Sequence, residues 1–441
     1  MSQKDLRMIL TKRLSRGGAT TFLINAIGMG LSMVMQIVLA RLLGAIGYGI
    51  FAFVTTIMTF MLFATKLGFD TLIVRYVPVY QVNEKWDLIK GLIRRTNQFG
   101  LVLSILAGIV GLVFLGWNYQ QIDAEQFTAY LAGFFSLPFL TLAILRQSTL
   151  QAFKDVLFAQ LPEKIVRPIM TIILVTVIAA FGWKVSAGNV MICYGLSIFI
   201  SYILGAIVLM KRVGPLTTGV TPCYETKNWF RLSISLMVNA GMYLILGQLN
   251  ILVIGILHGE TEAGVFSAAV RLGALVTFML TAVNMTASPL ISESYAKSDL
   301  KAMQHICMVT GRIGFVFAAL IFALFLVCGR WLLGLFGPEF TVAYPALLLI
   351  SLGQLFNAYC GQNGTVATMT GRERAQTKIL IVAAAINVFL NLLLIPLFGI
   401  TGGAIASAAS VMFWNVATVI LIRDELGLQT LVWVPSRSRE G

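Results

Sequence analysis

The sequence predicts an all-α, polytopic membrane protein of twelve transmembrane helices, arranged as two six-helix lobes. Three observations predict this fold class. First, 58% of the 441 residues are hydrophobic and only 11% are charged, with a mean hydropathy of +0.88. One aqueous core cannot hide that much apolar surface, so lipid has to cover it. Second, long apolar runs alternate with short polar breaks, and third, one of these breaks occurs twice.

The repeated break is a short, glycine-containing segment between two apolar runs. It reads RLLGAIGYGIF at 41–51 and HGETEAGVF at 258–266, so that Gly44 and Gly259 stand 215 residues apart. Further matches at offsets of 215 or 217 are Gly49 with Gly264, Phe51 with Phe266, Tyr80 with Tyr295, and Phe181-Gly182 with Phe398-Gly399. Each match alone is weak, but the shared offset predicts two copies of one membrane unit, with both tips on the outer side.

The helices are expected in the same order in each copy. Residues 1–16 are basic and precede an uncharged run longer than a signal-peptide core, so the first helix is retained. Lys66 and Asp70 fall inside the second helix, four residues apart, and are able to pair. The predicted helices are 17–40, 50–76, 98–117, 127–145, 168–181 and 188–210, then 232–257, 265–291, 313–335, 344–369, 379–398 and 402–422.

These helices divide the chain into an N-lobe at 1–212, a cytoplasmic linker at 213–231, a C-lobe at 232–422 and a cytoplasmic tail at 423–441. All Lys and Arg residues except Arg41, Lys66, Lys184, Arg271 and Arg330 then fall in predicted cytoplasmic segments. This is a strong positive-inside pattern, and it places both termini in the cytoplasm. It also explains the formal charge of +14 without nucleic acid as a partner. Two lobes that enter from the same side favour alternating access across a cleft between them.

Catalysis is not expected from this inventory of residues. The two histidines, His258 and His305, lie near no nucleophile motif and in no metal-ligand spacing, and no phosphate-binding loop is found. The five cysteines are scattered without a CxxC pair, which favours reduced core residues. We therefore expect neither an enzyme nor a cofactor nor a metal site.

Candidate substrate-binding residues are cations inside the membrane. Arg271 lies about seven residues, or roughly 10 Å, into its helix, where it either lines the cleft or snorkels toward an outer-loop Glu. Lys66 has Asp70 as an alternative, structural partner, and Arg41 either contacts substrate or anchors its helix at the interface. Arg75 and Arg146, like Arg167, lie near inner helix ends, where ordinary positive-inside placement is the competing explanation.

Two amides complete the candidate set. Asn25 and Asn239 occupy nearly equivalent places in the first helix of each copy, where they either face each other across the cleft or bond between helices. The small residues at 402–410 are interpreted as a close-packing helix face without a substrate role.

The stretches NVFLNLLLIPLFGITGGAIAS at 387–407 and ARLLGAIGYGIF at 40–51 resemble the polysaccharide flippases of the MOP superfamily, and among them the Wzx-type transporters of O-antigen and related lipid-linked repeat units. The resemblance covers essentially the whole chain. It implies two six-helix lobes around a cationic cavity in the bacterial cytoplasmic membrane. It further implies that the chain flips an undecaprenyl-pyrophosphate-linked oligosaccharide to the outer leaflet, with membrane lipids and a polysaccharide polymerase and chain-length machinery as partners.

Two alternatives stay open at this point. A drug exporter of the related MATE type shares the twelve-helix plan but binds cations, and such a cavity should contain an acid. No acid lies in the middle of the helices predicted at 17–40 and 232–257. The other alternative is a non-transporting scaffold of a glycan assembly complex, which would tolerate the loss of every buried cation.

Overall fold

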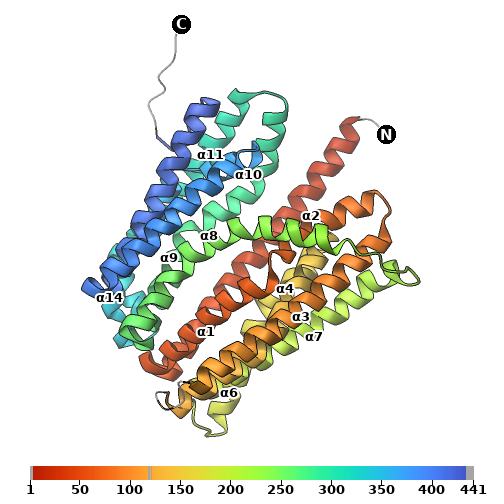
Figure 1. Ribbon diagram of the computed structural model, residues 1–441. Helices are drawn as coiled ribbons and strands as arrows, with labels where there is room; N and C mark the ends of the chain where they lie inside the picture. Colours follow the sequence, from red (N-terminus) through yellow and green to blue (C-terminus); the bar gives the residue numbers. More distant parts are fainter. Residues whose placement is uncertain (1–2, 118–119, 121, 434–441) are drawn as a thin grey trace. The chain divides into compact units, whose positions relative to one another are not determined.

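The computed structural model describes residues 3–117, 120 and 122–433, and the regular elements in this part of the chain are all helices (Figure 1). The chain forms two compact units, residues 1–241 and 242–441, and α8 (Thr226–His258) passes from the first into the second. Unit 1 contains α1 (Gln3–Lys66), α2 (Phe69–Val82), α3 (Trp86–Trp117), α4 (Ala124–Ala152), α5 (Val156–Leu161), the π-helix η2 (Pro162–Val166), α6 (Arg167–Ala180) and α7 (Ala187–Thr217). Unit 2 contains α9 (Glu260–Gly273), the 3-10 helix η3 (Ala274–Thr277), α10 (Phe278–Ala296), α11 (Leu300–Gly334), the 3-10 helix η4 (Pro338–Ala343), α12 (Tyr344–Tyr359), α13 (Asn363–Met369) and α14 (Glu373–Leu426).

Within the described residues, nine helical stretches are long and apolar enough to cross a membrane. Helix α3 shows how such a helix meets both protein and lipid. Gly100, Ser104, Gly108 and Gly111 are buried, and Gly100 and Gly111 lie against side chains of α4. Val110 and Phe114 of the same helix are exposed. Small residues let membrane helices approach closely, while large apolar side chains face acyl chains. The protein is therefore an all-helical, multi-pass membrane protein.

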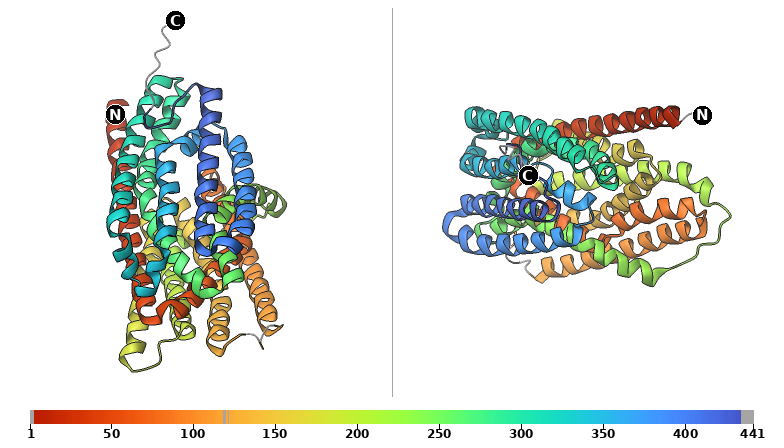
Figure 2. Two further views of the ribbon diagram at one scale, coloured as in Figure 1. Left: turned by 90° about the vertical axis from the view of Figure 1, so that its left-hand side faces the viewer. Right: turned by 90° about the horizontal axis from the view of Figure 1, so that it is seen from above.

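The backbone breaks repeat between the two units, as the sequence predicts for the tips. Gly44 (φ 65°) and Gly259 (φ 92°) both leave the helical region at the repeated tip. The other left-handed positions with counterparts 214 or 217 residues later are Glu84 with Ser298, Lys154 with Gly371, and Gly182 with Gly399. Gly44 and Gly399 lie inside α1 and α14, and both ribbons turn back on themselves (Figures 1 and 2). The predicted turns at 44 and 399 are confirmed.

The helix predicted at 50–76 is wrong as a continuous element. It breaks at Leu67 (φ 47°) and Gly68 (φ 74°), between α1 and α2. The break lies against α8, where a Cβ added to Gly68 would lie 2.5 Å from the Ser233 carbonyl oxygen. Only glycine combines this close approach with a left-handed backbone at little cost. Lys66 and Asp70 consequently lie on opposite sides of the break.

Unit 1 differs from the prediction in its connectors as well. The helix predicted at 168–181 begins twelve residues earlier, and Val156–Ala180 runs through the π-helix η2. Glu163 and Lys164, which fall between the helices predicted at 127–145 and 168–181, therefore lie within a helix. In the predicted linker, the irregular part is only 218–225. There the Cys223 N–H donates to the Asp87 carbonyl oxygen of α3, and the Val220 carbonyl oxygen accepts from Lys90 Nζ of the same helix.

Unit 2 has two interruptions that the prediction did not contain. The helix predicted at 265–291 passes through η3, and the helix predicted at 344–369 breaks at 360–362, where Gly361 has a φ of 69°. After α14, residues 427–433 of the predicted tail pack on unit 2, and Val432 donates its backbone N–H to Tyr359 at 3.1 Å. Residues 434–441 of that tail lie outside the described residues. The small residues near 402–410 are confirmed as a packing face, since Gly353 of α12 meets Ala408 closely.

The break at Gly68 predicts a specific stability effect. Gly68→Ala should lower the thermal stability of the detergent-purified protein by about 1–2 kcal/mol or more, because it adds left-handed strain and a clash. Gly30→Ala is the matched control in α1, with no atom within 4 Å of the added carbon. The control should be neutral or slightly stabilising. Equal melting curves for the two variants, followed by tryptophan fluorescence, would contradict the assignment of this break.

Candidate functional site

The charged centre of unit 1 is Glu163 in the π-helix. Arg146 of α4 places Nη2 3.0 Å from Glu163 Oε1, and Arg167 places Nη1 3.2 Å from Glu163 Oε2. Arg146 and Glu163 are 2% and 5% exposed, and the guanidinium of Arg146 fills the space beside Gly205 that a side chain would otherwise occupy. One buried carboxylate is therefore shared by two arginines, and the predicted site residue Arg146 has a structural partner.

Lys164 is the next residue of the π-helix, and it contacts a predicted candidate. Its Nζ donates to Asn25 Oδ1 of α1. The approach is tight because Gly28, one turn along α1, lies against the Lys164 side chain. No carboxylate pairs with Lys164 among the described residues, so a half-buried ammonium is held by a neutral amide. Such a cation remains able to bind an anion.

Lys66 and Asp70 form the ion pair that the sequence predicts. Lys66 Nζ lies 2.6 Å from Asp70 Oδ2, and the two side chains are 20% and 19% exposed. The i, i+4 spacing survives the break at 67–68 because the chain resumes a helical path at Phe69. Asp70 Oδ1 is buried and has no hydrogen-bond partner within the described chain. The pair is thus close to neutral, and a substrate role for Lys66 stays a prediction.

The remaining predicted residues lie apart from these pairs. Arg271 is half-buried at the end of α9, where Nε lies 3.3 Å from Ser267 Oγ; the described residues contain no acid paired with it. Asn239 of α8 is half-buried, with an Oδ1 that finds no partner within the described residues. Arg41 and Arg75 are exposed. Asn25 and Asn239 both belong to unit 1 rather than to one unit each. Substrate roles remain predictions for Arg271, Asn239, Arg41, Arg75 and Asn25.

Unit 2 contains a polar pocket of about 390 Å³. Its lining carries no charged side chain; it consists of hydroxyls, amides, glycines and a few apolar or aromatic groups. Both interruptions of unit 2 reach it, because Thr277 ends η3 and Gln362 lies between α12 and α13. The polar and aromatic lining residues are Tyr243, Thr277, Thr281, Asn284, Ser288, Asn357, Gln362, Asn363, Thr365, Thr368 and Trp414.

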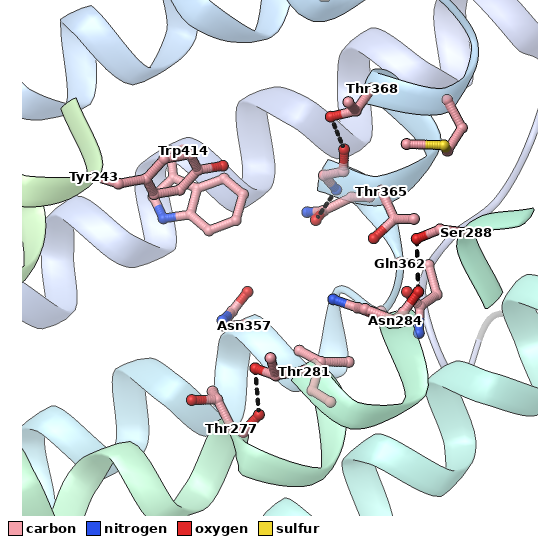
Figure 3. Close-up of a pocket in the computed structure, with 15 residues that line it drawn as sticks. Tyr243, Thr277, Thr281, Asn284, Ser288, Asn357, Gln362, Thr365, Thr368 and Trp414 are labelled. Atoms are coloured by element: carbon pink, nitrogen blue, oxygen red, sulfur yellow. Dashed lines mark hydrogen bonds between the residues drawn. The ribbon is translucent and has the colours of Figure 1, made fainter. Parts of the chain in front are cut away.

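The two sides of the pocket differ in chemistry. Figure 3 shows Tyr243 and Trp414 on one side and Asn284 and Gln362 on the other. The aromatic rings meet edge to face, with centroids 6.5 Å apart at 86°. Gln362 is 1% exposed, and neither its Nε2 nor its Oε1 has a hydrogen-bond partner within the described residues. The pocket therefore has an aromatic wall facing an amide wall.

Other buried amides of unit 2 are structural. Asn391 Nδ2 donates to Asn250 Oδ1 at 2.6 Å and to Asn387 Oδ1 at 2.9 Å, and Asn387 donates to Ser410. All four side chains are buried, and their hydrogen bonds connect α8 with the parts of α14 before and after Gly399. Buried polar groups that bond to one another in this way hold membrane helices together. Asn391 Oδ1 alone of these amide oxygens has no hydrogen-bond partner within the described residues, and the cluster does not line the pocket.

Sequence reasoning missed Lys164 and the whole pocket. Lys164 falls between the helices predicted at 127–145 and 168–181, in a segment whose mixed charges are typical of a connector. The pocket draws on α8, α10, α12, α13 and α14, which one sequence does not bring together. One signal was present, since Gly361-Gln-Asn-Gly364 sets two amides between glycines inside an apolar run. Within the described residues, no group of His, Cys, Asp and Glu side chains could hold a metal ion.

Two family models match the chain. The model described as polysaccharide biosynthesis protein matches residues 14–295, and the MatE model matches residues 235–393. Among curated proteins, an uncharacterised membrane protein of Methanocaldococcus jannaschii is 21% identical over 86% of this chain and 77% of its own length. The probable low-salt glycan biosynthesis flippase Agl15 of Haloferax volcanii is 22% identical over 90% of this chain and 81% of its own length.

Solved structures show the same fold at low identity. An inward-facing multidrug resistance transporter of the MATE family and MOP superfamily superposes with a TM-score of 0.72 at 13% identity, covering 93% of this chain and 98% of that chain. The lipid II flippase MurJ in an inward closed conformation superposes with a TM-score of 0.67 at 14% identity, covering 92% of this chain and 87% of that chain.

The shared carboxylate predicts an asymmetry between two substitutions. Glu163→Gln leaves the buried Arg146 without an anion and should cost on the order of 3–5 kcal/mol of stability. Arg146→Met leaves Glu163 paired with Arg167 and should cost clearly less. Glu293→Gln, which removes the exposed pair with Lys297, is the control and should cost under about 1 kcal/mol. Thermal denaturation with Glu163→Gln as stable as Glu293→Gln would disprove the shared buried charge.

Proposed function

The chain belongs to the polysaccharide biosynthesis protein family of the MOP superfamily, and from that membership we propose that it flips a lipid-linked oligosaccharide from the cytoplasmic to the outer leaflet. The proposed carrier is undecaprenyl pyrophosphate, and the proposed mechanism is alternating access. The two curated relatives named above are archaeal, and the name of one states glycan biosynthesis and flippase activity. This supports a glycan substrate for the present chain.

The observation that carries the proposal is that the buried acid Glu163, and Asp70 beside the break between α1 and α2, are both paired with cations. Glu163 is the one carboxylate among the buried side chains of the described residues, and two arginines contact it. Asp70 is paired with Lys66. A site for organic cations needs an uncompensated acid, whereas a site for a diphosphate needs uncompensated cations. The balance of charge in unit 1 favours the diphosphate.

Lys164 of unit 1 and Arg271 of unit 2 are each suited to bind an anionic phosphate group. Neither is paired with a carboxylate in the described chain, and neither is fully exposed. A diphosphate that leaves water needs donors to replace its hydration, and ammonium and guanidinium groups supply charged ones. An inside-negative membrane potential would also favour outward movement, by up to about 2.3 kcal/mol per charge per 100 mV.

A twelve-helix topology is part of the proposal. Gly44 and Gly399 each divide one of the nine candidate spans in two, and Val156–Ala180 supplies one further crossing. The repeated left-handed positions support two copies of one six-helix plan. The MatE match at 235–393 keeps cation export as the rival function, and the neutral lining of the unit 2 pocket argues against it.

The test is translocation in vesicles by variants with matched amounts of folded protein. Lys164→Ala and Arg271→Ala should each lower the rate for a pyrophosphate-linked oligosaccharide roughly tenfold or more, because each removes a charged hydrogen bond of about 1.5–3 kcal/mol. Lys66→Met combined with Asp70→Asn tests the paired lysine without leaving a lone carboxylate. The rate is measured as glycan protected from, or exposed to, an added glycosidase.

Lys297→Ala is the control, because this lysine lies on the surface in an exposed pair. It should translocate at the wild-type rate. Wild-type rates in the three cation variants would reject a cationic head-group site. No translocation by the wild-type protein, with glycan synthesis still dependent on its presence in cells, would favour a scaffold.

A further inference from the structure

The unit 2 pocket lies where two helices of this unit are interrupted. In unit 1, α4 runs unbroken from Ala124 to Ala152, whereas its counterpart in unit 2 stops at Tyr359 and restarts at Asn363. The second interruption, η3, reaches the same pocket through Thr277. Irregular backbone at membrane depth is tolerated where it is buried in protein or lines a polar cavity. Discontinuous helices of this kind form substrate sites in transporters.

The break at 360–362 is fixed by contacts with residues that do not line the pocket. A Cβ on Gly361 would collide with the Thr430 carbonyl oxygen, so the segment after α14 packs directly against the break. Val432 N–H donates to Tyr359 O on the same side. Asn363 donates to Asn415 Oδ1 at 2.8 Å, which fixes the start of α13. The amides at the break are thereby positioned by residues outside the pocket.

The lining offers hydrogen bonds without charge. Asn284 and Asn357 line the pocket from α10 and α12, and each amide supplies donors and an acceptor. Asn284 Oδ1 and both polar atoms of the Gln362 side chain have no partner within the described residues. Thr281 and Ser288 add hydroxyls. A ligand that matches this surface carries several groups that both donate and accept, and it carries no net charge.

The aromatic wall narrows the class of ligand further. Tyr243 is 46% exposed, and its ring stands edge to face with Trp414. Gln376, which is 2% exposed, donates to the Tyr243 hydroxyl at 3.4 Å and accepts from Thr368 at 3.1 Å. It therefore joins the aromatic wall to α13. A sugar ring has an apolar C–H face for such a wall and hydroxyls around its edge for the amides.

We propose that this pocket binds an uncharged sugar ring of the transported oligosaccharide, while the cations described above bind the diphosphate. The inference rests on the proposed function. In this proposal the amides, hydroxyls and aromatic rings of the unit 2 pocket recognise the glycan. The volume of about 390 Å³ suits one or two rings rather than a whole oligosaccharide, because small-molecule sites span about 300–1,000 Å³. Specificity then follows from the hydroxyls that the amides can pair, since a site built to bond a hydroxyl rejects a ligand without it.

The test is binding of free methyl hexopyranosides to the purified protein in lipid nanodiscs, followed by saturation-transfer NMR. At least one of the methyl glycosides of glucose, galactose, mannose and N-acetylglucosamine should give a signal. Asn284→Ala and Asn357→Ala should reduce it at least fivefold, and Thr281→Val should reduce it to a smaller extent. Thr286→Val is the matched control, because Thr286 is exposed on the same helix and does not line the pocket. It should leave the signal unchanged.

Two outcomes would overturn the proposal: no glycoside signal in the wild-type protein, or a signal that Asn284→Ala and Asn357→Ala leave intact. Preferential binding of tetraethylammonium in the same assay would likewise overturn it, in favour of a cation pocket. Lys164→Ala should keep the glycoside signal while it loses binding of inorganic pyrophosphate. If the wild-type protein binds glycosides through the pocket amides but moves no lipid-linked oligosaccharide, the proposed function fails and the sugar pocket stands.

Discussion

A helix inside lipid has to satisfy its own backbone hydrogen bonds, and this constraint orders the whole structure. Each interruption needs a cause, and the causes fall into two kinds. Gly44 with Gly259, and Gly182 with Gly399, are turns that both units share. The interruptions at 67–68, 274–277 and 360–362 have no such counterparts. Those at 67–68 and 360–362 each bring a glycine against a backbone carbonyl oxygen, and those at 274–277 and 360–362 line the pocket of unit 2. The units therefore share a plan but differ where irregular backbone was added.

The same constraint applies to charge. Unit 1 buries a carboxylate within its helices and neutralises it with two arginines. Unit 2 lines its pocket with amides, hydroxyls and two aromatic rings, without charge. A charged lipid diphosphate and a neutral glycan are two ends of one substrate with opposite solvation needs. In this account Lys164 of unit 1 and Arg271 of unit 2 suit the diphosphate, and the neutral pocket of unit 2 suits the glycan.

Much of this architecture could be predicted from the sequence, because membrane helices leave strong signals. Composition predicted the class of fold, and the offset between Gly44 and Gly259 predicted the repeated tip. The pairing of Lys66 with Asp70 was predicted from spacing alone, and the structure confirms it. The break beside these two residues was missed, because it lies against the backbone of α8 at Ser233, far along the chain. Lys164 was missed because the mixed charges of its segment are typical of a connector, although the segment forms a π-helix. The pocket was missed because its walls come from five α-helices and the 3-10 helix η3.

The central claim is that the substrate is an anionic glycolipid and not a cation. The most direct measurement offers the wild-type protein both in one set of sealed vesicles: a pyrophosphate-linked oligosaccharide in the bilayer, and a fluorescent organic cation in solution. The account predicts protein-dependent translocation of the glycolipid and no protein-dependent movement of the dye. Movement of the dye, with the glycolipid remaining in its original leaflet, would contradict it.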